Sequence, residues 1–309
     1  MRLSVIIPTH NPDPERLRRT LLGLRAQTQP GTDWETVLVN NASTRWLDEN
    51  YFAACAPGNF FIVAEPELGL TAARRRGLTA ARGDLAVLVD DDNVLAPDYL
   101  AEVVARFEAQ PRLGAAGGKS HPEFAVEPAA WIREFYPLLA LRDLGDEPLT
   151  ATSLRPAGSA RADYPPCAPI GAGMALRRAA WEAWLKASDG GALSDRRGQS
   201  LSSGGDNEIV FHVMEAGWAV AYCPSLRLTH LIPAGRLAPH YLARLNHGIQ
   251  ESWQQVLARH HASPWPPLTA TGATLRQIRA WFIHRAWSSP AARIRWQGAC
   301  GHFSGRVPR

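Results

Sequence analysis

The chain has 309 residues and a hydrophobic content of 46%, which is enough to bury a substantial core as one large domain or two small ones. Its four cysteines lie far apart without CxxC spacing, so they indicate neither a zinc site nor a disulfide framework and favour a reducing, cytoplasmic environment. The N-terminal apolar run is too short for a signal peptide, and no stretch approaches the roughly 18 apolar residues of a membrane span. The net charge of +4 favours anionic partners.

The first 120 residues alternate short apolar runs with helical patterns. Strands are predicted over 3–7, 36–39, 60–63, 85–89 and 113–116. Helices are predicted over 15–26, 47–53, 71–81 and 98–109. Repeated βα units of this kind indicate an α/β fold with a Rossmann-like, mostly parallel sheet flanked by helices, in which ligands bind outside the carboxyl ends of the strands.

The second part of the chain is less regular. A Pro/Gly/Ser-rich loop is predicted over 143–169. It is followed by a glycine-rich run at 171–176, helices over 178–187 and 206–216, and strands over 218–222 and 226–230. After Pro233 the pattern is helical to the end, with a proline-rich break at 264–267.

Polar clusters follow three of the predicted strands, at 9–11, 40–44 and 90–93. The last cluster places Asp90, Asp91 and Asp92 together, and like charges this close resist being ionised at the same time. A divalent metal bound to a substrate diphosphate would explain them, whereas the alternative is a solvated acidic turn that caps the helix after Pro97. Because all three clusters mark the same edge of the sheet, the metal site is the favoured interpretation.

Five motifs occur in order along the chain: SVIIPTHN at 4–11, VNNAST at 39–44, GLTAAR at 69–74, DDDN at 90–93 and GD at 205–206. In order and spacing they resemble the inverting family 2 glycosyltransferases of the GT-A fold, over residues 3–245. The run HLIP at 230–233, followed by Arg236, looks most similar to bacterial polysaccharide-assembling members, including those of hormogonium polysaccharide biosynthesis.

The resemblance implies a GT-A catalytic domain over 1–240, followed by a helical C-terminal extension over 241–309. Within the catalytic domain, residues 1–120 would form the nucleotide-binding half and 121–240 the acceptor half. The implied nucleotide-binding residues are Pro8, Thr9, His10, Asn40, Arg74, Asp90 and Asp91.

Asn40 departs from the family, which usually has aspartate at this position. An amide keeps one acceptor for the ring N–H of uracil, and the alternative is a turn asparagine that caps the next element. Arg75 and Arg76 extend the positive charge beside Arg74, and at least one of them is expected on a solvated face.

The resemblance assigns Asp92 and His230 to a divalent metal, Mn²⁺ or Mg²⁺, which would stabilise the departing nucleoside diphosphate. Without the other motifs, a single histidine would more often be packed or solvent-facing than a ligand. The implied pocket for the sugar or acceptor comprises Gly171, Gly173, Met174 and Gly205.

Asp206 is the candidate catalytic base, because a sugar hydroxyl needs a carboxylate to accept its proton. Gly205 replaces the glutamate that precedes this aspartate in the family. An ordinary helix N-cap is the alternative role for Asp206, and Glu208 is a lower-ranked substitute base.

The tail from Arg236 to Arg309 contains ten arginines, five tryptophans from Trp253 onward and one acidic residue, Glu251. Ile278 and Phe282 belong to an amphipathic helical pattern in this tail. The favoured role of this helix is packing against the catalytic domain, and the alternative is peripheral contact with the inner face of a membrane.

The favoured function is metal-dependent inverting transfer of a sugar from a nucleoside diphosphate, with uridine diphosphate as the favoured carrier, to a saccharide or lipid-linked saccharide hydroxyl in polysaccharide biosynthesis. No nucleic-acid partner is expected. A nucleotidyltransferase is one alternative, although PTHNP after the first strand is not a glycine-rich phosphate loop. A non-catalytic protein that binds sugar nucleotides is the other, motivated by Asn40 and Gly205 at positions where the family has acids.

Overall fold

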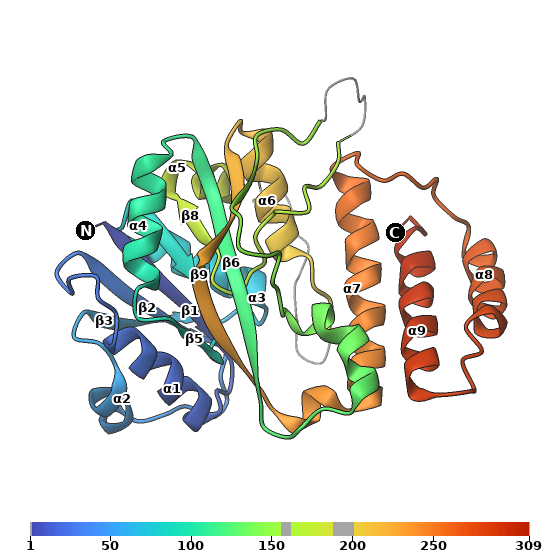
Figure 1. The fold of residues 1–309 in the computed structure, drawn as a ribbon, viewed down its shortest axis with the longest axis horizontal. Coiled ribbons are helices and arrows are strands. Elements are labelled where there is room, and N and C mark those ends of the chain that lie inside the picture. Colours follow the sequence, from blue (N-terminus) through green and yellow to red (C-terminus); the bar gives the residue numbers. More distant parts are fainter. Residues whose placement is uncertain (1, 156–161, 188–200, 309) are drawn as a thin grey trace.

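The computed structural model describes residues 2–155, 162–187 and 201–308, so residues 156–161 of the predicted loop lie outside the described residues. Its central feature is a nine-stranded mixed sheet flanked by helices, as Figure 1 shows. Among the described residues, no helix is long and apolar enough to cross a membrane.

The strands are β1 (Leu3–Thr9), β2 (Trp34–Asn41), β3 (Phe60–Glu65), β4 (Leu85–Leu88), β5 (Asn93–Leu95), β6 (Leu113–Phe124), β7 (Leu149–Ala151), β8 (Ala175–Arg177) and β9 (Ala219–Ile232). Their order in the sheet is β3-β2-β1-β4-β8-β6-β9-β5, and β7 pairs with β9.

The α-helices are α1 (Pro14–Arg25), α2 (Glu49–Cys55), α3 (Leu70–Ala80), α4 (Tyr99–Ala109), α5 (Arg178–Ala187), α6 (Gly205–Glu215), α7 (Pro239–Arg259), α8 (Ala270–Ile283) and α9 (Pro290–Gly305). Two 3₁₀ segments, η1 (Ala130–Leu139) and η3 (Ala234–Leu237), lie before and after β9 in the chain. Local chemistry sets these boundaries: at α1, the Asp13 side chain accepts from the Arg16 N–H and Pro14 occupies the first turn.

The alternation of side chains along each strand builds two apolar layers. Val5 and Ile7 of β1 face one side, where α1, α2 and α4 cover the sheet, whereas Ile6 faces the opposite side with α3, α5 and α6. Trp181 and Trp184 of α5 are both fully buried in the second layer. The predicted α/β sheet with helices on both faces is therefore confirmed.

The direction of the strands changes across the sheet. Strands β3, β2, β1 and β4 are parallel, as the repeated βα units predict. The short strand β8 then runs antiparallel between β4 and β6. Strand β9 is parallel to β6 and joins the two predicted strands over 218–222 and 226–230 into one, with a register shift between Gly117 and Lys119 of β6 opposite the junction.

The three C-terminal helices stand side by side at one end of the sheet, in the order α7, α9, α8 (Figure 1). Leu242 and Leu245 of α7 share a core with Ile132 of η1 and Ile294 of α9, while Val256 near the end of α7 joins the core around α6. The predicted boundary at residue 240 thus falls just inside α7, which packs on both the sheet domain and α9. Trp281 of α8 packs edge-on against a tryptophan of α9, so the predicted amphipathic helix is seated on α9 rather than on the catalytic domain.

Candidate active site

Two adjoining cavities open beside the carboxyl ends of β1, β2 and β4. The first has a volume of about 240 Å³ and is lined by Pro8, Thr9, His10, Asn41, Leu68, Leu70, Ala73, Asp90, Asp91, Asp92, Ala140, His230 and Arg236. The second has a volume of about 340 Å³. Its walls include Arg74, Tyr164, Gly171, Ser203, Asp206, Asn207 and Trp253. Leu70, Asp90 and Ala140 line both cavities, so the two spaces share one wall.

The loops that follow β1 and β2 hold each other at the rim of the first cavity. Asn11 has a left-handed backbone, which asparagine tolerates better than most residues. Its side-chain oxygen accepts from the Thr44 and Arg45 N–H groups, both at 2.9 Å, and its own N–H donates to the Ser43 hydroxyl at 2.9 Å. The predicted base-contacting run that ends at His10 therefore lies on a rigid rim.

The carboxyl group of Asp91 has a raised pKa. Burial, together with the neighbouring charge of Asp92, raises the pKa of Asp91 to about 7, although a hydrogen bond from the Thr9 hydroxyl opposes this shift. Asp90 contributes a smaller effect in the same direction as Asp92. The crowding of three carboxyl groups that the sequence predicted is therefore present in the fold.

Asp92 meets His230 because β5 pairs with β9. The antiparallel register sets Asn93 opposite His230, and the Leu231 N–H donates to the Asp92 carbonyl at 2.8 Å. One carboxylate oxygen of Asp92 then lies 3.5 Å from His230 Nε2, with both side chains 4% exposed. The two predicted metal ligands are thus brought together in one buried corner of the first cavity.

Arg236, which the sequence analysis noted only as part of a motif, closes this corner. Its guanidinium lies 2.8 Å from Asp92 Oδ2 and 2.9 Å from His230 Nε2. Because a guanidinium only donates hydrogen bonds, His230 Nε2 is the acceptor in its contact with Arg236. Desolvation lowers the pKa of Arg236, but the combined attraction of Asp92 and of the smaller contributions from Tyr241, Asp90 and Asp91 outweighs it, and the net shift is upward.

The donor set in this corner fits a divalent cation. Carboxylate oxygens together with an imidazole nitrogen suit Mn²⁺. A cation held by Asp92 and His230 would compete with Arg236 for the same atoms, because Arg236 contacts both side chains.

The two adjacent asparagines after β2 have different surroundings. Asn40 Oδ1 accepts from the Ser43 N–H at 3.2 Å, as expected for a turn cap. Asn41 is 4% exposed and lines the first cavity. Its amide donates to the Glu67 carbonyl at 2.6 Å and accepts from the Gly69 N–H at 2.9 Å, so it fixes the loop that leads into α3. The sequence pattern does not predict this role, because it does not show which of the two asparagines turns inward.

Arg74, Gly171 and Asp206 meet at the second cavity. Arg74 is buried, and its guanidinium lies 3.8 Å from the Asp90 carboxylate. The Gly171 N–H donates to Asp206 Oδ2 at 2.9 Å, and a Cβ at this glycine would lie 2.5 Å from the Arg74 guanidinium. Gly171 therefore lets the arginine and the aspartate approach the same backbone segment, whereas the sequence-based prediction is that a Cβ here would crowd the bound sugar or acceptor.

The neighbouring arginines point elsewhere. Arg75 donates to the Leu185 carbonyl at 3.3 Å and lies over the Trp184 ring. Arg76 is exposed and donates to the Ala64 carbonyl at 3.2 Å. Of the three consecutive arginines, Arg74 is the one that lines a cavity.

Asp206 and Glu208 take opposite directions from α6. Asp206 lies in the first turn, after Gly204 as the helix cap, and its carboxylate also accepts from the Asn207 N–H at 2.9 Å. Glu208 is 1% exposed and forms an ion pair of 2.9 Å with Arg259 of α7. Side chains two positions apart do not share a helix face, so only Asp206 reaches the second cavity.

Three residues predicted for the sugar or acceptor pocket line neither cavity. Gly173 has a left-handed backbone, and the Tyr99 hydroxyl donates to its carbonyl at 2.5 Å, so the absence of a side chain serves that close contact. Met174 is fully buried in the core of the second layer. Gly205 is buried at the start of α6. Gly171 is the member of this set that faces a cavity.

The family model described as "Glycosyl transferase family 2" matches residues 4–167, just over half of the 309-residue chain. The chain belongs to glycosyltransferase family 2. This membership favours a sugar-transferring enzyme over the nucleotidyltransferase alternative. The matched residues include those that line both cavities up to residue 167.

Sequence relatives resemble limited parts of the chain. The O-antigen biosynthesis protein RfbC of Myxococcus xanthus is 34% identical over 117 residues, which is 36% of this chain and 9% of that protein. An N-acetylglucosaminyltransferase of Bradyrhizobium elkanii is 28% identical over 119 residues, which is 38% of this chain and 65% of that protein. The chain thus matches only a small part of RfbC and somewhat less than two thirds of the Bradyrhizobium enzyme.

A solved structure, residues 1–349 of S. aureus TarS, is similar over 99% of this chain and 90% of that chain. The TM-score is 0.51 at 16% sequence identity. At this identity the likeness concerns the fold alone, and it agrees with the GT-A architecture of the glycosyltransferase.

Proposed function

We propose that the enzyme transfers a sugar, with inversion, from a nucleoside diphosphate to a hydroxyl of a saccharide or lipid-linked saccharide during polysaccharide assembly. The observation that carries the proposal is the wall that the two cavities share at Asp90. Pro8, Thr9, His10 and Asp91 line one cavity and Arg74 and Asp206 line the other, whereas Asn40 is among the lining residues of neither. The relatives support the glycan context, since one is described as an O-antigen biosynthesis protein and another as an N-acetylglucosaminyltransferase.

In this proposal the first cavity holds the nucleotide. The segment that ends at His10 lies against the base, Asp91 binds the ribose, and Arg74 faces the diphosphate where the cavities meet. Asp92 and His230 would hold Mn²⁺ or Mg²⁺, which supplies Lewis-acid stabilisation of the leaving diphosphate. Arg236 is buried beside them and adds a fixed positive charge to the same corner.

Asp206 acts as the base in the second cavity. The acceptor oxygen forms a bond to the anomeric carbon while the bond from that carbon to the diphosphate oxygen breaks, and the acceptor proton moves to the Asp206 carboxylate. Two backbone N–H groups, from Gly171 and Asn207, hold the carboxylate in place. Glu208 is committed to Arg259 and does not line the cavity, which disfavours it as the substitute base.

The direct test measures turnover with a panel of nucleoside diphosphate sugars, saccharide and lipid-linked acceptors, and Mn²⁺ or Mg²⁺. We expect transfer from a UDP-sugar, with product of inverted anomeric configuration by NMR. Retained configuration would overturn the inverting mechanism. Tight donor binding without transfer to any acceptor would instead favour the non-catalytic binding protein.

Asn40→Ala is expected to weaken UDP binding by roughly 0.5–3 kcal/mol, the range for losing one hydrogen bond and leaving its partner unpaired. The loss should be larger for UDP than for ADP if the amide accepts from uracil. Asn40→Asp is the matched control, because it keeps an acceptor both for uracil and for the Ser43 N–H. Calorimetry with both nucleotides checks this, and equal losses for UDP and ADP would mean that Asn40 acts only as the turn cap.

We also propose that the outer side of α8 rests on an anionic membrane surface. The α8 surface comprises five exposed apolar side chains, Leu275, Ile278, Phe282, Ile283 and Trp287, and three exposed arginines, Arg276, Arg279 and Arg285. Helix α8 is the outermost helix in Figure 1, with α9 on its inner side. No acidic residue follows Glu251 in the chain, so the charge of this region complements anionic lipid headgroups.

The double substitution Ile278→Asp with Phe282→Asp is expected to reduce binding to phosphatidylglycerol vesicles at least about tenfold, because it removes two apolar contacts and adds two like charges. Co-sedimentation measures the effect. Val126→Asp is the control, since Val126 is similarly exposed, at 49%, but lies outside α8. Equal binding of the double variant and the control would overturn the membrane contact.

A further inference from the structure

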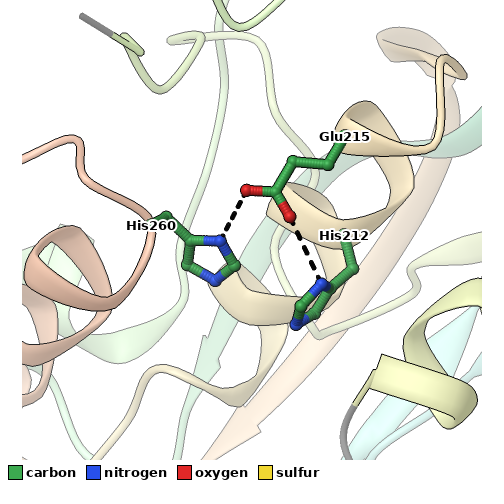
Figure 2. Close-up of side chains that lie close together, drawn as sticks. All are labelled: His212, Glu215 and His260. Carbon is green, nitrogen blue, oxygen red and sulfur yellow. Dashed lines mark hydrogen bonds and ion pairs between the residues drawn. The ribbon is translucent and has the colours of Figure 1, made fainter.

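Three side chains with metal-binding atoms converge at the far end of α6 from Asp206. His212 Nδ1 lies 3.3 Å from Glu215 Oε2, and His260 Nδ1 lies 2.7 Å from Glu215 Oε1. Figure 2 shows the carboxylate between the two imidazole rings. With about 1.5 Å of rise per residue, His212 and Glu215 lie about 9 Å and about 14 Å along the helix axis from the proposed base.

The sequence and fold both contribute to the cluster. His212 and Glu215 are three residues apart and therefore share one face of α6. His260 follows directly after α7 and reaches them because the end of α7 packs on α6. Its ring stacks on Phe211 at a centroid distance of 4.3 Å and an interplanar angle of 6°, which fixes the plane of the imidazole.

The His212–Glu215 distance of 3.3 Å matches the spacing of ligand atoms in a transition-metal site, and the His260–Glu215 distance of 2.7 Å is shorter than that spacing. In a tetrahedral site with bonds of about 2.0–2.1 Å, neighbouring ligand atoms are separated by about 3.3 Å. The three side chains each offer a ligand atom, and these atoms lie within 4.8 Å of one another.

The cluster is buried on the side of His260 and exposed to solvent on the side of Glu215. The side chain of His260 is 4% exposed, that of His212 19% and that of Glu215 42%. Nε2 of His260 is buried without a hydrogen-bond partner in the described part of the chain, so Glu215 makes the polar contact that holds this ring. A cation can enter from the Glu215 side, where water can supply a fourth ligand.

We propose that His212, Glu215 and His260 bind a divalent transition-metal ion, with Zn²⁺ as the best match, that fastens α6 to the end of α7. Two imidazole nitrogens and one carboxylate oxygen suit Zn²⁺, whereas Mg²⁺ and Ca²⁺ prefer six or more oxygen ligands. The ion would stabilise the helix that carries Asp206 without touching the reacting groups.

The test titrates Zn²⁺ calorimetrically into the Asp92→Ala protein, in which the proposed donor-site metal ligand is absent. We expect one equivalent to bind and to raise the melting temperature. His212→Gln and His260→Gln, each in the same background, should weaken binding at least about tenfold, which is the lower end of the effect of losing an outer-shell partner. His240→Gln is the control, because His240 is an exposed histidine at the start of α7.

Absence of a one-equivalent Zn²⁺ site, or equal affinity in the two glutamine variants and the control, would overturn the proposal. If neither variant folds, Co²⁺ added to the Asp92→Ala protein decides. Visible bands of a tetrahedral nitrogen and oxygen site that disappear on adding Zn²⁺ support the proposal, and the absence of such bands overturns it. None of these readouts depends on sugar transfer, so their failure leaves the proposed enzymatic function to its own tests.

Discussion

The Asp206→Asn protein is expected to transfer sugar about two to four orders of magnitude more slowly than the unsubstituted enzyme while binding the donor with the same affinity. Asparagine keeps the shape of the side chain, and its one oxygen can accept from either the Gly171 or the Asn207 N–H, which donate to different oxygens of the carboxylate. The asparagine side chain cannot take up the proton of the acceptor hydroxyl at neutral pH. The measurement is the single-turnover transfer rate together with donor affinity on the same protein, at one pH and one metal concentration.

Glu208→Gln is the matched control for this experiment. Glu208 is on the same helix, but its ion pair with Arg259 faces away from the second cavity. The control should therefore lower the melting temperature and leave the transfer rate close to that of the unsubstituted enzyme. If transfer persists in Asp206→Asn but is lost in Glu208→Gln, Glu208 is the catalytic base. If transfer persists in both variants, Asp206 has only a structural role at the helix terminus.

Asp92→Ala is expected to abolish the metal dependence of UDP binding. The decisive quantity is the UDP affinity measured with Mn²⁺ divided by the UDP affinity measured with EDTA. This ratio should fall to about one, because a site that loses its central carboxylate no longer holds the cation near the diphosphate. Measuring the ratio matters because Arg236 lies 2.8 Å from Asp92 and can still attract the diphosphate when the carboxylate is gone.

Asp98→Ala serves as the control for charge. Asp98 is a nearby carboxylate that pairs with Arg227 at 3.0 Å, outside both cavities. Circular dichroism shows whether each variant keeps its fold. A metal-dependence ratio in Asp92→Ala equal to that of the Asp98→Ala control would contradict the assignment of Asp92 to the metal.

The sequence was sufficient for the parts of the molecule that local patterns specify. Continuous apolar runs predicted the strands from Leu3 to Leu88, because parallel strands covered on both faces carry apolar side chains on both sides. Polar residues directly after those strands predicted one edge as the site, and the structure gathers Thr9, Asp91 and Asp92 in a single cavity there. These features depend on residues that are close in the chain.

The tertiary structure decided which side chains meet. His230 reaches Asp92 because β5 pairs antiparallel with β9, and Arg236 joins them from the following 3₁₀ segment. Local periodicity does not encode such pairings, since the register between distant strands is set by the hydrophobic faces and connections of the whole sheet. The same holds for the inward turn of Asn41, and for His260, which meets α6 only when α7 is packed on the catalytic domain.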